Sequence, residues 1–236
     1  IHHFLEQLPP SVKRIAVLDR TKEPGAGGEP LYLDICNALY QAQIEMEVYG
    51  GRYGLASKDT TPAQIAAVFD NLMDVQPKNH FTIGIEDDVT HHSLAVHPDF
   101  PIQTPAGLMQ CKFWGLGSDG TVGANKQAVK IIGEYAKPYV QGYFSYDSKK
   151  SGGLTVSHLR FGDTPIRSEY LIQEADYIAC HNESFLNSGY DLTEGLKENG
   201  IFVLNTQYGA EQIGGKLPKE MVHALIEKNA RLYLID

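Results

Sequence analysis

The most distinctive chemistry in the sequence lies in a glycine-rich stretch, Gly115-x-Gly117-x-x-Gly120. The stretch follows an apolar run typical of a strand and opens a run typical of a helix. Glycines let the backbone approach an anion closely, and a helix N-terminus offers unpaired N–H groups with a partial positive charge. This strand–loop–helix context predicts a phosphate-binding loop, and a tight turn without a ligand is the simpler alternative.

The residues that follow the glycines argue against NAD. In a dinucleotide-binding fingerprint, an acidic residue about 20 positions on holds the ribose. Here the next expected strand ends at Asp147, 32 residues after Gly115, and Lys149 and Lys150 come directly afterwards. Two lysines at this place favour a ribose that carries a phosphate, as in NADP or coenzyme A. An ordinary solvated loop is the alternative for this pair.

Other polar residues give weaker indications. Arg160 lies near a strand end, where it would contact either a phosphate or an acidic neighbour. His181 and Asn182 follow another expected strand, but packing or capping is the more common role for a lone histidine. The acidic and histidine-rich segment 86–97 matches no spacing typical of a metal site.

Composition narrows the class of protein. With 42% hydrophobic and 21% charged residues among 236, the chain should bury a core, and its net charge of −9 argues against nucleic-acid binding. Its cysteines, Cys36, Cys111 and Cys180, are too scattered for a disulfide framework and form no C-x-x-C, so we expect neither a zinc ribbon nor a ferredoxin-type cluster. They fit a reducing cytoplasm. No signal peptide is visible, and no apolar run approaches the roughly 18–20 residues of a membrane span.

The elements that must position these residues alternate between strand and helix. We expect strands at 12–18, 47–53, 81–85, 111–116, 139–146, 154–159, 177–180, 201–205 and 231–235, and helices at 30–41, 61–73, 121–136, 168–175, 192–198 and 219–229. This alternation implies an α/β fold with parallel sheets wound by right-handed crossovers. In such sheets ligands bind beyond the carboxyl ends of the strands, where the glycine loop is placed.

A proline-punctuated stretch divides the chain. Pro98, Pro101 and Pro105 lie within residues 96–107, and prolines at this density resist both helix and central strand. Residues 1–105 hold 7 basic and 14 acidic residues, whereas residues 106–236 hold 13 and 15. We therefore predict two domains, residues 1–103 and 104–236. The first residue is not methionine and the last five read as a strand, so we expect a fragment of a longer protein.

Five long strings carry a family resemblance. They are LDRTKEPGAGGEPLYLD (18–34), GGRYGLASKD (50–59), PKNHFTIGIEDDVTH (77–91), CKFWGLGSDGTVGANK (111–126) and QGYFSYDSKKSGGLTVSHLRFG (141–162). They closely resemble pyruvate:ferredoxin (flavodoxin) oxidoreductase. The resemblance implies an enzyme that oxidises pyruvate with coenzyme A to acetyl-CoA and CO2 and passes electrons to ferredoxin or flavodoxin. It also implies thiamine diphosphate, magnesium and 4Fe-4S clusters in the full-length protein.

The resemblance assigns the two domains. Residues 1–103 look like part of the transketolase C-terminal-like domain, and residues 104–236 like most of the Rossmann-like, gamma-subunit-like domain. The thiamine and cluster domains would lie outside this chain, so we expect no catalytic residue here and no turnover by the fragment alone. The implied partners are the remaining domains of the polypeptide, a second copy in a homodimer, and ferredoxin or flavodoxin, with neither nucleic acid nor a membrane. The implied location is the cytoplasm.

The resemblance also implies a ligand for the glycine loop, because the third domain of this family contributes to coenzyme A binding. The matching residues are Gly117, Ser118, Asp119, Gly120 and Thr121, expected to contact a phosphate or pyrophosphate, with Lys149 or Lys150 holding a coenzyme A phosphate. Asp119 would repel a phosphate, so its carboxylate should cap the helix or turn outward. Two other readings stay open: an NADP-binding dehydrogenase domain and a scaffold without a ligand.

Overall fold

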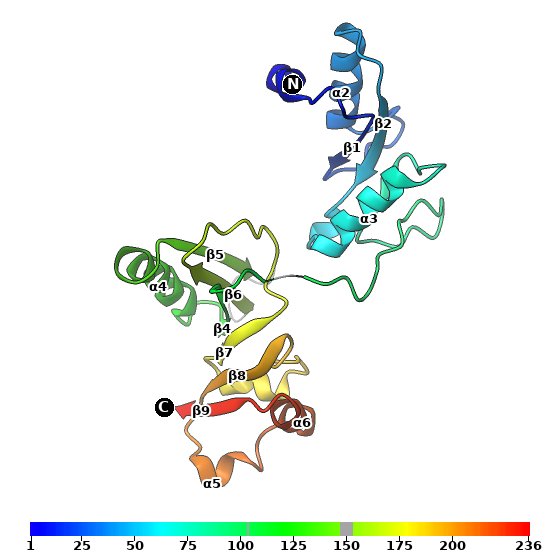
Figure 1. The fold of residues 1–236 in the computed structure, drawn as a ribbon. Helices are drawn as coiled ribbons and strands as arrows, with labels where there is room; N and C mark the ends of the chain where they lie inside the picture. Colours follow the sequence, from blue (N-terminus) through cyan, green and yellow to red (C-terminus); the bar gives the residue numbers. More distant parts are fainter. Residues whose placement is uncertain (103, 147–152) are drawn as a thin grey trace. The chain divides into compact units, whose positions relative to one another are not determined.

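The computed structural model describes residues 1–102, 104–146 and 153–236, and it divides into two compact units, residues 1–103 and 104–236 (Figure 1). This division falls where the proline-rich stretch places the domain boundary. Each unit is built on its own β-sheet with helices, which confirms the expected class of two consecutive α/β units. No helix within the described ranges is both long and apolar enough to cross a membrane.

The first unit is a small parallel sheet with helices. Its strands, in the order β1-β2-β3, are β1 (Arg14–Asp19), β2 (Glu47–Arg52) and β3 (Phe81–Thr82). Its helices are α1 (His2–Gln7), α2 (Pro30–Gln41), the 3₁₀ turn η1 (Leu55–Ser57) and α3 (Pro62–Met73). Both β1–β2 and β2–β3 pair in parallel, as the alternation predicts.

The two long helices of this unit begin where local chemistry requires. Each has proline at its first position, where a missing N–H costs nothing. Thr61 and Gln64 form a capping box at the start of α3. Along α2, Ile35, Ala38 and Leu39 lie at i, i+3 and i+4 and are buried on one face.

The second unit is a six-stranded sheet in the order β5-β6-β4-β7-β8-β9. Its strands are β4 (Met109–Leu116), β5 (Tyr139–Tyr146), β6 (Leu154–Gly162), β7 (Ala175–Cys180), β8 (Leu196–Asn205) and β9 (Arg231–Ile235). Its helices are α4 (Thr121–Tyr135), the 3₁₀ turn η2 (Glu183–Asn187), α5 (Ala210–Ile213) and α6 (Lys219–Glu227).

This second sheet is mixed, which corrects the expectation of an entirely parallel one. Strand β6 runs antiparallel to both of its neighbours, β4 and β5, while β4, β7, β8 and β9 pair in parallel. The reason lies in chain length: only seven residues separate Tyr146 from Leu154. A parallel crossover needs a dozen or more residues, whereas a short connection suits antiparallel neighbours.

Two expected helices, 168–175 and 192–198, are wrong. Residues 168–174 are irregular, and β8 already begins at Leu196. Gly195 has a φ of +75°, and a Cβ there would lie 2.0 Å from the carbonyl oxygen of Gln173. The Ala175 N–H donates to the Gly195 carbonyl, so the two segments are joined backbone to backbone. Their apolar residues, including Ile172 and Leu192, are spaced for burial in the core and not for a helix face.

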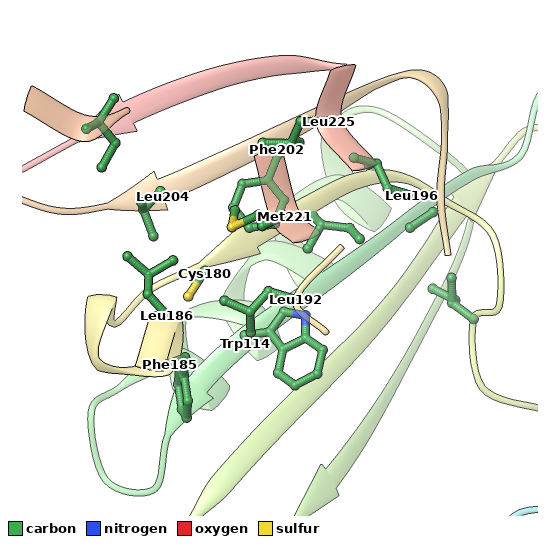
Figure 2. Close-up of a cluster of buried hydrophobic side chains, with 14 residues drawn as sticks. Trp114, Cys180, Phe185, Leu186, Leu192, Leu196, Phe202, Leu204, Met221 and Leu225 are labelled. Carbon is green, nitrogen blue, oxygen red and sulfur yellow. The ribbon is translucent and has the colours of Figure 1, made fainter. Parts of the chain in front are cut away.

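The main hydrophobic core covers one face of this sheet (Figure 2). Trp114 of β4 and Phe202 of β8 belong to one cluster of buried side chains with Met221 and Leu225 of α6. Helix α4 covers the opposite face, because Gly115 follows Trp114 on the strand and a Cβ on it would contact Thr121 of α4. The sheet is therefore packed on both faces around β4, and its carboxyl edge is the place where loops can hold a ligand.

Candidate functional site

The chain leaves two neighbouring strands of the second sheet in opposite directions. From β4 it passes through α4 to β5 on one side, and from β7 it passes through η2 to β8 on the other. Strands β4 and β7 are parallel neighbours, so their carboxyl ends border a topological switch point. Ligands of open α/β sheets bind at such points, and the glycine loop lies at this one.

Two of the three glycines in the motif are needed by the turn itself. A Cβ on Gly115 would lie 2.6 Å from Cβ and Oγ1 of Thr121, so glycine permits α4 to pack close to β4. Gly120, the N-cap of α4, has a φ of +91°, which a side chain would strain. The space around Gly120 and Gly123 is open, because a Cβ added to either would have no neighbouring atom within 4 Å. The turn therefore explains part of the glycine spacing and leaves room beside the loop.

The Asp119 carboxylate binds its own loop. Its two oxygens accept hydrogen bonds from the N–H groups of Leu116 and Thr121, each at 2.7 Å. Of the two expected orientations, the structure thus has the one in which Asp119 caps the helix. This arrangement uses the first N–H of α4 and fixes the turn, and it leaves the following N–H groups available.

Several backbone donors gather around the loop. Among the described residues, no acceptor bonds the N–H groups of Ser118, Gly120, Val122 or Gly123, whereas Ala124 bonds the Gly120 carbonyl. The Gly117 N–H is used by the Gly153 carbonyl at 2.7 Å. The open donors lie at the N-terminus of a 15-residue helix, where the helix dipole favours negative charge. The loop can therefore bind an anion such as a phosphate group.

Thr121 turns its hydroxyl to the next strand instead of to the open side. Its Oγ1 lies 2.9 Å from Nδ1 of His181, which directly follows β7. Thr121 is only 4% exposed, so a direct side-chain contact with a ligand is not what this conformation offers. Burial lowers the pKa of His181, and the nearby Asp119 carboxylate opposes that shift. The sequence suggests packing or capping for His181, and nothing in it indicates a bond to a residue 60 positions away.

The sequence suggests three cationic residues as phosphate ligands, and the structure describes only one of them, Arg160. Lys149 and Lys150 lie outside the described residues, so their predicted phosphate contact stays a prediction. Arg160 is buried, no acidic partner bonds it among the described residues, and it lies beside Gln110 near the start of β4, at the other end of that strand from the glycine loop. It donates to the side-chain oxygens of Gln110 and Gln141 and to the Ser168 carbonyl.

The acidic segment of the first unit is committed to its own loop. Asp87 accepts hydrogen bonds from the hydroxyl and N–H of Thr90, which hold the pKa of Asp87 well below its usual range. Within the described ranges no group of three or more His, Cys, Asp or Glu side chains could hold a metal ion. Hydrogen bonding within a loop accounts for Asp87 without a metal.

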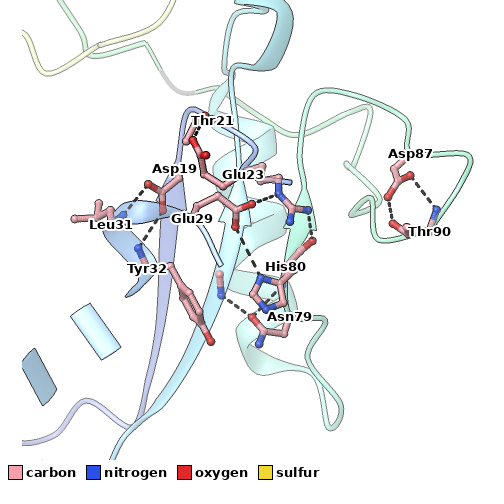
Figure 3. A network of polar contacts seen from close by, with 12 residues as sticks. Asp19, Thr21, Glu23, Glu29, Leu31, Tyr32, Asn79, His80, Asp87 and Thr90 are labelled. Carbon is pink, nitrogen blue, oxygen red and sulfur yellow. Dashed lines mark hydrogen bonds and ion pairs between the residues drawn. The ribbon is translucent and has the colours of Figure 1, made fainter. Parts of the chain in front are cut away.

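The carboxyl edge of the first sheet is filled by a polar network (Figure 3). Asp19, at the end of β1, accepts from the N–H groups of Leu31 and Tyr32 at 2.9 and 3.1 Å. Glu29, which is 1% exposed, pairs with Arg52 at 2.6 Å. The first free N–H groups of α2 are thus bonded by the Asp19 carboxylate, and the candidate ligand site among the described residues is the loop of the second unit.

The second unit is of the class of open α/β folds that carry a glycine loop at the switch point, the place where such folds bind their ligands. Comparison with known proteins narrows this class, because the model of the family "Pyruvate ferredoxin/flavodoxin oxidoreductase" matches residues 110–236. The chain belongs to this family.

Individual relatives agree with the family match. The chain is 56% identical over 234 residues to the pyruvate:ferredoxin oxidoreductase of Moorella thermoacetica and 53% identical over 234 residues to the pyruvate-flavodoxin oxidoreductase of Klebsiella pneumoniae. Each alignment covers 99% of this chain and 20% of the relative, so the chain spans about a fifth of their length. The solved structure of the pyruvate oxidoreductase subunit PORC of Thermotoga maritima overlaps 55% of this chain and 62% of its own at 22% identity and a TM-score of 0.42, which is too distant to carry an argument.

Proposed function

We propose that this chain is part of an enzyme that oxidises pyruvate with coenzyme A to acetyl-CoA and CO2, and that its second unit binds coenzyme A. The two electrons released pass to ferredoxin or flavodoxin. Family membership and the names of the relatives support the pyruvate and acceptor parts of this proposal. The observation that carries the coenzyme A part is the cluster of open N–H groups at the start of α4.

In this proposal the loop binds phosphate oxygens through backbone groups. The N–H groups of Ser118, Gly120, Val122 and Gly123 donate, the dipole of α4 adds a partial positive charge, and Asp119 holds the turn without contacting the ligand. Lys149 or Lys150 supplies the charge for a ribose phosphate. Gly117 and Thr121 shape the loop, through the Gly153 carbonyl and through His181.

The redox chemistry belongs to other parts of the full-length protein. Thiamine diphosphate with magnesium supplies decarboxylation, and 4Fe-4S clusters carry the electrons. Cys111 and Cys180 are poor cluster ligands as they stand, because burial raises the pKa of Cys111 to about 12 and that of Cys180 to about 11. The partners we propose are the remaining domains of the polypeptide, a second copy of it, and the electron acceptor, all in the cytoplasm.

A dehydrogenase domain that binds NADP is the second candidate, because NADP also carries a pyrophosphate and a ribose phosphate. The two candidates separate in one experiment on the full-length protein: calorimetric titration with coenzyme A and with NADP, together with pyruvate-dependent reduction of a low-potential acceptor. We expect coenzyme A to bind and to stimulate reduction, and the isolated 236-residue chain to show neither turnover nor cluster absorbance. Binding of NADP without coenzyme A binding would overturn the proposal.

A further inference from the structure

We propose that His181 is a positioning residue for the coenzyme A loop: by bonding Oγ1 of Thr121 from the neighbouring strand, it holds the first turn of α4 in the orientation that binds phosphate. This inference rests on the proposed function, because it concerns the same loop. His181 is assigned no contact with the ligand itself. Its part is to join the ends of β4 and β7 across the switch point.

Thr121 is held from three directions. Its N–H donates to Asp119, its side chain fits against the bare Cα of Gly115, and its hydroxyl bonds His181. The Asp119 contact comes from the loop itself, and the Gly115 contact comes from β4, the strand that leads into α4. Of the three, only the His181 contact ties this residue to another strand, and it therefore fixes the helix start relative to the rest of the sheet.

His181 is itself well anchored. Its N–H donates to the Trp114 carbonyl at 2.9 Å, and its carbonyl accepts from the side chain of Asn205 at 3.1 Å. Its ring lies against Phe113, with centroids 5.9 Å apart. Contacts with β4 and with the end of β8 thus fix the backbone and ring, so that Nδ1 is a rigid partner for Thr121.

The consequence for binding follows from sequence order. The open N–H groups of Val122 and Gly123 come immediately after Thr121 on the same helical turn. If Thr121 shifts, these donors shift with it, and a misplacement of about 1 Å is enough to weaken a preorganised site. A histidine that only packed against Phe113 would not need a hydrogen-bonding atom at Nδ1.

Two amide substitutions distinguish the roles of the two ring nitrogens of His181. His181→Asn places an amide group where Nδ1 was, and His181→Gln places it nearer the position of Nε2. Thr121→Val keeps the shape of the threonine and removes its hydroxyl. In the full-length enzyme, we expect His181→Gln and Thr121→Val each to raise the KM for coenzyme A about threefold to tenfold, the range for one lost hydrogen bond, with kcat changed less than about twofold.

If Thr121 and His181 act through one shared hydrogen bond, their effects on the KM for coenzyme A should not add. The double variant Thr121→Val/His181→Gln should be no worse than either single variant, and His181→Asn should recover most of the affinity. His223→Gln is the matched control, because His223 is an exposed histidine of α6. Each variant is also checked by thermal unfolding.

Three results would overturn the inference. Additive effects in the double variant would mean that the two residues act independently. Rescue by Gln but not by Asn would mean that Nε2 contacts the ligand directly. A fall in kcat and in melting temperature as large as the rise in KM would mean a structural role alone. If instead the unmodified enzyme showed no dependence on coenzyme A, the proposed function itself would fail, which is a distinguishable result.

Discussion

The two units of this chain differ in how the backbone N–H groups at the start of a helix are bonded. In the first unit, Asp19 accepts from both Leu31 and Tyr32, the second and third residues of α2, whose first residue is a proline without an N–H. In the second unit, one oxygen of Asp119 accepts from Thr121, the first residue of α4, and the other accepts from Leu116, which precedes the helix. The first free N–H groups of α2 are bonded by Asp19, whereas among the described residues no acceptor bonds the N–H groups of Val122 and Gly123 in α4.

The position of each aspartate in the chain explains the difference. Asp19 ends its strand, and a ten-residue loop returns α2 to it from the side. Asp119 lies only two residues before the helix begins, so its short side chain reaches the first N–H and no further. Similar strand–loop–helix units therefore acquire different capacities for ligands from where one carboxylate is placed.

The largest expected effect comes from blocking the open start of α4. Gly120→Val adds a β-branched side chain at a φ of +91° beside the open N–H groups, and we expect the KM for coenzyme A to rise by more than about a hundredfold. The measurement is coenzyme A-dependent pyruvate oxidation by the full-length enzyme. Gly107→Val is the matched control, because Gly107 also has positive φ and open space but lies outside the loop. Equal losses in both variants would mean that backbone strain, not ligand contact, is responsible.

Removal of the lysine that holds the ribose phosphate should have the next largest effect. A charge-assisted contact is worth about 1.5–3 kcal/mol, so either Lys149→Ala or Lys150→Ala should weaken coenzyme A binding about ten- to a hundredfold. The effect should shrink as salt rises. Dephospho-coenzyme A is the control, since the affected variant should lose its preference for the phosphorylated form. Wild-type affinity in both variants would return the pair to a solvated loop.

Acid should destabilise the second unit through His158. Burial lowers the pKa of His158 to about 3, so the folded protein keeps this imidazole neutral while the unfolded chain takes up a proton below its ordinary value of 6.5. Stability should therefore fall as pH drops from about 6.5 toward 3, by about 1.4 kcal/mol for each pH unit from this group. Urea unfolding of the His158→Asn variant, which keeps an acceptor for the Ile172 N–H, should show a slope smaller by that amount. An unchanged slope would contradict the assignment.

The smallest effect tests the closed side of the comparison. Asp19→Ala removes the side chain that caps α2 and should cost about 1 kcal/mol of stability, the usual loss for such a cap. It should leave the KM for coenzyme A unchanged, because Asp19 belongs to the first unit. Denaturant unfolding and the KM are measured together. A raised KM would show that the first unit also contributes to the ligand site.

Local chemistry made much of this fold predictable. Proline at the start of α2 and the Thr61 cap of α3 place helix starts, and the expected range 139–146 coincides with β5. The helices expected at 168–175 and 192–198 fail because contacts distant in sequence, such as that between Gly195 and Gln173, decide the backbone there. The seven-residue connection between β5 and β6 is too short for a parallel crossover, so the antiparallel pairing was predictable from the sequence. The prediction of parallel strands came from the helix–strand alternation of the chain as a whole.

The local parts of the candidate site were also predictable from the sequence, but its contacts between strands were not. The glycine loop follows from the spacing of residues 115–120 and from its place between strand and helix. Electrostatic repulsion of a phosphate predicts that Asp119 either caps the helix or turns outward, and the structure has the capping orientation. The hydrogen bond between Thr121 and His181 was not predictable, because it requires β4 and β7 to be neighbours in the sheet. Local sequence patterns do not determine strand order.

A crystal structure of the full-length protein with coenzyme A bound tests the open start of α4 most directly. We predict phosphate oxygens within about 2.7–3.2 Å of the N–H groups of Val122 and Gly123, with Asp119 still bonded to Leu116 and Thr121. The start of α2 should hold no ligand, because Asp19 occupies its donors. Coenzyme A phosphates bound elsewhere, with these two N–H groups facing only water, would contradict the assignment of the loop.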